Sequence, residues 1–175
     1  PLYSITALPA NTFATAINNA GQVVGEVAVG TEGHAFIWAG GVLTDLGSVG
    51  TASTARAISN NGLVAGYTVA GERIRAFVHD GTGLIPLGTL GGANSTGHGV
   101  NSLGQVVGQS NNADGAFRGF LYSDGAMTDL GTLGGDFSFA AAINSRGQVV
   151  GESSLTFDPV SAVHAFVFED GAMRD

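Results

Sequence analysis

Short apolar runs alternate with glycine-rich turns along the whole chain, and one ten-residue pattern of apolar and polar positions returns four times. In each copy an Asn or Ser opens a turn and a Gly follows three residues later. After one further residue, a Gln or Leu, come two apolar residues and a second Gly. The copies lie at 16–25, 57–66, 99–108 and 142–151, with spacings of 41, 42 and 43 residues. A nearly constant period predicts a repeat architecture in which one structural unit is reused.

Each repeat carries the local signals of β-structure. The Gly that closes the predicted type I turn falls at the same phase in every copy, at Gly21, Gly62, Gly104 and Gly147. A second apolar block follows at 34–38, 75–79, 118–122 and 164–168, and then an Asp-Gly or Gly-Gly pair leads to a third block. Such pairs are typical of tight hairpins, and no segment keeps a helical period. We therefore expect each unit to be a four-stranded antiparallel meander.

Side-chain size changes across the predicted unit. The first strand carries Ala or Gly in all four copies, whereas the third strand carries Phe followed by a second large ring. Small inner and bulky outer strands fit a wedge-shaped blade, and units of about 40 to 45 residues are typical of propeller blades. The sequence thus predicts an all-β, β-propeller-like array of four-stranded antiparallel meander blades, with four repeats of 41–46 residues.

We expect a single repeat domain over residues 1–175. It begins with a strand at 1–9 and continues with blades at approximately 10–50, 51–92, 93–135 and 136–175. Segment 1–9 has the pattern of a fourth strand, and residues 171–175 begin another. Three arrangements stay open: a closed ring completed by the first strand, a longer array of which this chain is a part, and strand edges that pair between chains.

Composition excludes several functions. Hydrophobic residues make up 44% of the chain, too many for a disordered acidic tail. Six arginines, no lysine and 14 acidic residues give a net charge of −8, which disfavours nucleic-acid binding. The absence of cysteine excludes disulfides and thiol chemistry. Glycines interrupt every apolar run well before the roughly 18 residues of a membrane helix, so no membrane span is predicted.

The blocks at 16–25, 34–38 and 125–135 resemble the HAF-repeat family, a group of bacterial proteins described as probable extracellular repeats. His34-Ala35-Phe36 and the segment 164–166 match the family name directly, whereas Arg75 and Arg118 replace the His in the other two copies. The resemblance covers nearly the whole chain. It implies a β-rich protein that is extracellular or at the cell surface, and it carries no catalytic residues.

One repeated position holds a planar hydrogen-bond donor in every copy. The four residues are His34, Arg75, Arg118 and His164. Equivalent positions in separate blades point to separate interfaces, so we interpret them as structural. The donor is expected to bond the Asp of the fourth strand, as in Asp45. Two histidines without a third ligand do not make a zinc site, and no metal site is predicted.

His98 breaks the repeat. The matching positions of the other first strands hold Thr15, Arg56 and Ala141. In a propeller these positions lie near the central channel, where a few polar groups in a concave setting are typical of ligand sites. We therefore predict a polar, ligand-binding rim formed by Arg56, His98, Asn94 and Asp136. No catalytic cluster and no cofactor are predicted.

The expected function is that of a non-enzymatic binding or interaction scaffold at the cell surface or outside the cell, with other protein chains or extracellular glycans as partners. The alternative is a self-assembling structural protein, a homo-oligomer that forms a filament or surface layer through strand or blade pairing between chains. A polysaccharide-acting enzyme is a third hypothesis, for which no residue pattern argues.

Overall fold

All regular secondary structure is β in the computed structural model, which describes residues 5–155 and 163–175. The strands of these residues form four four-stranded antiparallel sheets, each with its strands in chain order. The first sheet contains β1 (Thr12–Ile17), β2 (Val23–Val29), β3 (Glu32–Ala39) and β4 (Val42–Asp45). The second contains β5 (Ala52–Ile58), β6 (Val64–Ala70), β7 (Arg73–His79) and β8 (Leu84–Pro86). The third contains β9 (Gly91–Val100), β10 (Val106–Asn112), β11 (Phe117–Ser123) and β12 (Ala126–Asp129). The fourth contains β13 (Ser138–Ile143), β14 (Val149–Ser154), β15 (Val163–Glu169) and β16 (Ala172–Arg174). The predicted all-β fold of four antiparallel meanders is confirmed.

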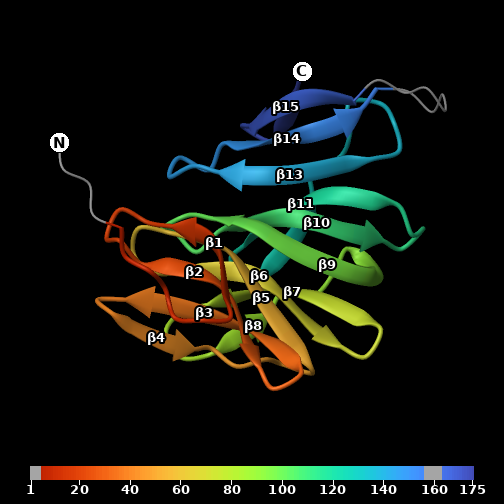
Figure 1. The fold of residues 1–175 in the computed structure, drawn as a ribbon. Coiled ribbons are helices and arrows are strands. Elements are labelled where there is room, and N and C mark those ends of the chain that lie inside the picture. Colours follow the sequence, from red (N-terminus) through yellow and green to blue (C-terminus); the bar gives the residue numbers. More distant parts are fainter. Residues whose placement is uncertain (1–4, 156–162) are drawn as a thin grey trace.

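The sheets follow one another through space as they do along the chain. Figure 1 shows the red and orange first sheet and the blue fourth sheet at opposite ends of the array, with the yellow and green sheets between them. Each first strand packs against the preceding sheet, β5 against β2 and β3, β9 against β6 and β7, and β13 against β10 and β11. No comparable contact joins the first sheet to the fourth among the described residues.

The fourth sheet has its own fourth strand. β16 pairs antiparallel with β15, and Phe168 lies opposite Met173. Of the strand expected at 1–9, residues 5–9 precede β1 without forming a strand, and residues 1–4 lie outside the described part of the chain.

The repeated turn has the geometry that its residues indicate. Gly21 lies at φ +72°, in the left-handed region that favours glycine, and its N–H donates to the Asn18 carbonyl at 3.0 Å. The side-chain oxygen of Asn18 accepts N–H bonds from Ala20 and Gln22, at 3.0 Å each. Asn101 and Asn144 make the same bonds to the residues two and four positions further along. The first hairpins of the first, third and fourth sheets are therefore each closed by an Asn, and in the second sheet Ser59 Oγ accepts the Leu63 N–H at 3.0 Å in its place.

Three separate apolar cores lie between successive sheets. Between the first two sheets, Val24 and Ala35 pack with Ala55, Val64 and Phe77. The equivalent residues pack between the second and third sheets and between the third and fourth. Small first-strand residues such as Ala55 and Ala140 and third-strand Phe residues such as Phe77 and Phe166 thus lie together where one sheet meets the next.

One position of each second strand requires glycine, because a carbonyl oxygen of the first strand lies too close to it for a side chain. Gly108 lies opposite Phe120 in the sheet, and a Cβ at Gly108 would come within 1.9 Å of the Thr96 carbonyl oxygen. The same approach, 1.9–2.0 Å from a first-strand carbonyl, holds at Gly25, Gly66 and Gly151. These glycines do not lie at positive φ, so the requirement is steric rather than conformational.

Candidate functional site

Each first strand contains a β-bulge, and the bulged residue is the one that departs from the repeat. The register of each first strand slips by one residue relative to the second strand, and the extra residue is Thr15, Arg56, His98 or Ala141. We call these four residues the bulge row. A bulge leaves its residue unpaired and re-aims its side chain, and bulges are common beside functional sites. The position singled out by sequence is therefore also structurally distinct.

His98 is partly buried in contact with an aromatic ring of the next sheet. Its ring lies 4.7 Å from the Phe139 ring, centroid to centroid, at an interplanar angle of 66°. Its Nε2 lies 3.0 Å from Thr96 Oγ1. Burial, and secondarily the positive charge of Arg56, lower the pKa of His98 to about 4. At neutral pH the imidazole is therefore uncharged and can both donate and accept a hydrogen bond.

Arg56 presents an exposed cation beside a tyrosine. The guanidinium carbon lies 5.4 Å from the centre of the Tyr67 ring on β6, within the range of a cation–π contact. Tyr67 lies opposite Thr54, two residues before the bulge. In the other sheets the residue at the Tyr67 position is polar: Glu26, Gln109 and Glu152. Sequence analysis missed Tyr67, although its departure from the polar residues of the other three copies was a usable signal.

The predicted rim is brought together only in part. The Arg56 charge acts on His98, so these two side chains lie near each other. Asn94 instead accepts the Ile74 N–H through Oδ1 at 2.9 Å, a contact between the second and third sheets. The Asp136 carboxylate accepts a bond from Ser154 Oγ at 3.4 Å. Asn94, within β9, and Asp136, which precedes β13, thus have structural partners away from the bulges.

The repeated donor position serves two different contacts. His34 Nδ1 lies 3.0 Å from Asp45 Oδ2, and His164 Nδ1 lies 2.8 Å from Asp175 Oδ2, which is the expected brace between third and fourth strands. Arg75 and Arg118 make a different contact, because each guanidinium donates to a backbone carbonyl of the next sheet. The acceptors are the carbonyls of Ala93 and Asp136. All four side chains have structural partners.

A buried serine joins each sheet to the one before it, which sequence analysis did not anticipate. Ser53 Oγ accepts the Ala35 N–H at 2.8 Å and donates to the Gly47 carbonyl at 2.5 Å. The same pair of bonds is made by Ser95 and by Ser138, with distances of 2.5–3.0 Å. We call this arrangement the serine clip. The recurrence of Ser at one phase of three repeats was the available signal.

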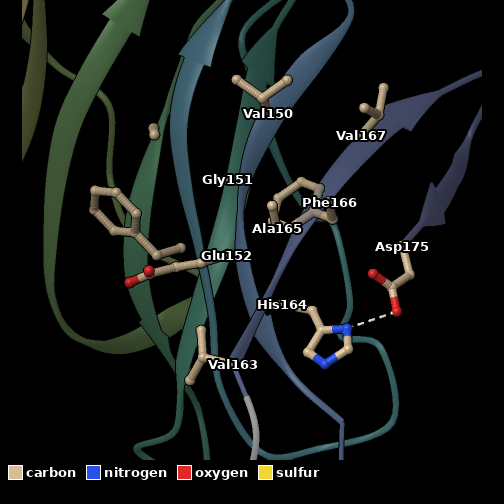
Figure 2. Close-up of a pocket in the computed structure, with 11 residues that line it drawn as sticks. Val150, Gly151, Glu152, Val163, His164, Ala165, Phe166, Val167 and Asp175 are labelled. Atoms are coloured by element: carbon tan, nitrogen blue, oxygen red, sulfur yellow. Dashed lines mark hydrogen bonds and ion pairs between the residues drawn. The ribbon is translucent and has the colours of Figure 1, made fainter.

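Two apolar hollows lie on the outer faces of the end sheets. The hollow on the fourth sheet has a volume of about 680 Å³ and is lined by Val150, Val163 and Val167 among others. Figure 2 shows Val150 and Val167 side by side on neighbouring strands, with the His164–Asp175 pair at its rim. The hollow on the first sheet, about 530 Å³, is lined by Leu8 of the segment before β1, by Ala14 and other residues of β1, and by Val23 and Trp38.

In comparisons with known proteins, no protein-family model matches the chain and no curated protein matches it in sequence. Within residues 5–155 and 163–175, no helix is long and apolar enough to cross a membrane. The same residues contain no group of three or more His, Asp or Glu side chains arranged to hold a metal ion.

Proposed function

We propose that this chain is a non-enzymatic binding scaffold of the cell surface or extracellular space, in which propeller-like blades present the bulge row to an extracellular glycan. One observation carries the proposal. Residues that recur in every repeat make the contacts between sheets, whereas residues that differ between repeats lie together at the four bulges. A constant scaffold with variable residues gathered on one row is the arrangement expected of a binding surface.

The chemistry of the row suits a polyhydroxylated ligand. Phe139 and Tyr67 offer ring surfaces for the apolar faces of a sugar, and Arg56 offers several N–H donors. The uncharged His98 and the carboxylate of Glu26 offer acceptors for hydroxyl groups. Sites of this kind combine apolar surface with a few placed polar groups.

A glycan array probed with the purified chain, followed by titration calorimetry on the best saccharide, tests the proposal. Arg56→Ala and His98→Ala should each weaken binding by about tenfold, the loss of one or two hydrogen bonds. Arg146→Ala, which removes an exposed arginine from a turn of the fourth sheet, should leave binding unchanged. Equal effects of Arg56→Ala and Arg146→Ala would contradict a site at the bulge row, and cleavage of the bound glycan would contradict a non-enzymatic role.

A second candidate function is self-assembly into an extracellular structure. The observation that favours it is the pair of exposed apolar sheet faces at the two ends of the array. Large exposed apolar faces on a protein commonly mark sites of association.

A further inference from the structure

The outer face of the fourth sheet is the face that every other sheet uses to contact its successor. Val24, Ala65 and Val107 occupy one position of the second strand in the first three sheets, and each is 0% exposed because the next sheet covers it. Val150 holds this position in the fourth sheet and is 44% exposed. Its neighbour Val167 is 40% exposed. The fourth sheet therefore has a complete contact face without an occupant among the described residues.

The outer face of the first sheet is the complementary face. Ala55 and Ala140, which meet the preceding sheet, are 0% exposed, whereas their counterpart Ala14 is exposed. The segment before β1 repeats the difference. Leu87 and Leu130 are buried in the cores between successive sheets, and their counterpart Ile5 is 98% exposed. The first sheet thus exposes the residues that the second, third and fourth sheets bury against the sheet before them.

The polar contacts between sheets are also incomplete at both ends. Asn18 and Asn101 each donate through Nδ2 to a carbonyl of the next sheet at 3.0 Å, those of Ser59 and Asn144. Asn144 Nδ2 donates to Gln148 Oε1, and no second acceptor is present in the described structure. The Asn18 carbonyl, which is equivalent to that of Ser59, accepts only the N–H of its own turn there.

The serine clip is also incomplete at both ends of the array. Among the described residues, the fourth sheet has the N–H donor without a serine, and the first sheet has a hydroxyl without that N–H donor. In β15 of the fourth sheet, Ala165 holds the position whose N–H donates to the serine in the other sheets, and no sheet follows the fourth in the described structure. Thr12 holds the serine position in the first sheet, and its hydroxyl donates to the Pro9 carbonyl. A threonine hydroxyl can accept an N–H as a serine hydroxyl does.

From these matching halves we infer that the fourth sheet binds the first sheet of a second copy of this chain, in the register of the three internal interfaces. Val150 and Ala165 then pack on Ala14 and Val23 of the second copy, the counterparts of Ala140 and Val149, and Asn144 Nδ2 donates to the Asn18 carbonyl of that copy. The two faces differ, so the contact is heterologous, head to tail. Two copies bring eight sheets, a number at which propellers close.

Continuity with an established interface identifies the occupant. The docked contact would repeat a surface that this chain already buries three times. Two hydrogen bonds of the internal interfaces would be missing. Phe13 takes the place of Thr54, which donates to Glu26. Val27 takes the place of Thr68, which accepts the Val49 N–H. The apolar core, the Asn side-chain hydrogen bond and the serine clip, with a threonine hydroxyl in place of serine, would all form in the docked contact. The inference rests on the second proposed function and names its partner and register.

Light scattering or sedimentation equilibrium of the full 175-residue chain over a wide concentration range tests the inference. The wild-type chain should have twice the 17.5 kDa of one chain, or a larger multiple. Val150→Arg and Ala14→Arg alter exposed side chains, so each variant should keep the β circular dichroism of the wild type. Each should weaken self-association by about a hundredfold or more, because an unpaired charge enters an apolar interface. Leu103→Arg, which changes an exposed residue on a turn outside both faces, should associate like the wild type.

Mixing the two variants distinguishes this contact from other modes of association. Val150→Arg keeps an intact first sheet and Ala14→Arg keeps an intact fourth sheet, so the mixture should form a one-to-one pair although each variant alone stays monomeric. A wild-type chain that stays monomeric at all concentrations would overturn both the inference and the self-assembly function. A Val150→Arg chain that assembles like the wild type would overturn the head-to-tail contact and leave self-assembly standing.

Discussion

Replacing Ser95 by Ala removes the serine clip between the second and third sheets. Ser95 is 2% exposed, and its hydroxyl accepts the Ala76 N–H at 3.0 Å and donates to the Gly88 carbonyl at 2.5 Å. Ala76 is itself 0% exposed, so its N–H would lose its partner without access to water. A buried unsatisfied donor costs about 1–3 kcal/mol, and the bond to the more exposed Gly88 about 0.5–1 kcal/mol. We expect the free energy of unfolding to fall by about 2–3 kcal/mol.

Urea unfolding followed by circular dichroism measures this loss. The midpoint should move to lower urea at an unchanged slope, because the substitution alters a contact and not the surface exposed on unfolding. Ser102→Ala, a matched change at an exposed turn of the third sheet, should shift the free energy by less than about 0.5 kcal/mol. If the two variants unfold at the same urea concentration, the clip does not stabilise the contact between sheets.

Three further outcomes are expected. Gly108→Ala should lower the free energy of unfolding in urea by about 3 kcal/mol or more, because the added Cβ meets a backbone oxygen of β9. Gly83→Ala, which has open space around its Cβ, should be neutral. Similar losses in the two variants would contradict the steric argument. The His98 pKa, followed by NMR, should be near 4. Since the unfolded chain binds this proton near pH 6.5 and the folded chain does not, stability should fall as pH drops from about 6.5 to 4, and His98→Gln should flatten that dependence. Asn101→Ala should destabilise by about 1 kcal/mol more than Asn144→Ala, which lacks the bond to a following sheet; equal losses would refute this difference.

The bulge row shows how far sequence reasoning reaches into the candidate site. Arg56 and His98 could be found because they break a repeat, and a departure from a period is visible in one sequence. The sequence groups Asn94 and Asp136 with them only because these residues are near along the chain. Residues four positions apart in a strand are about 13 Å from each other, so Asn94 lies well away from His98 along β9. Which residues share a site depends on the pairing of strands.

The four-stranded units, their turns and the all-β class follow from the sequence alone. Each depends on residues close together in the chain: Asn18 closes its own hairpin, and Gly21 adopts the left-handed backbone that its turn requires. The brace between His34 and Asp45 was also within reach, because the hairpin puts Asp45 opposite Phe36, two residues along the same strand from His34.

Only the tertiary structure decided how the sheets meet. The bulge that re-aims His98, the burial that lowers its pKa and the serine clip all depend on contacts between sheets or on strand register, which no local pattern encodes. The same holds for the end faces, since Val150 and Val107 have the same local sequence and differ only in whether another sheet lies on them. Burial is a property of what packs against a residue, so the repeat specifies a contact surface and the fold determines which copies of that surface are covered.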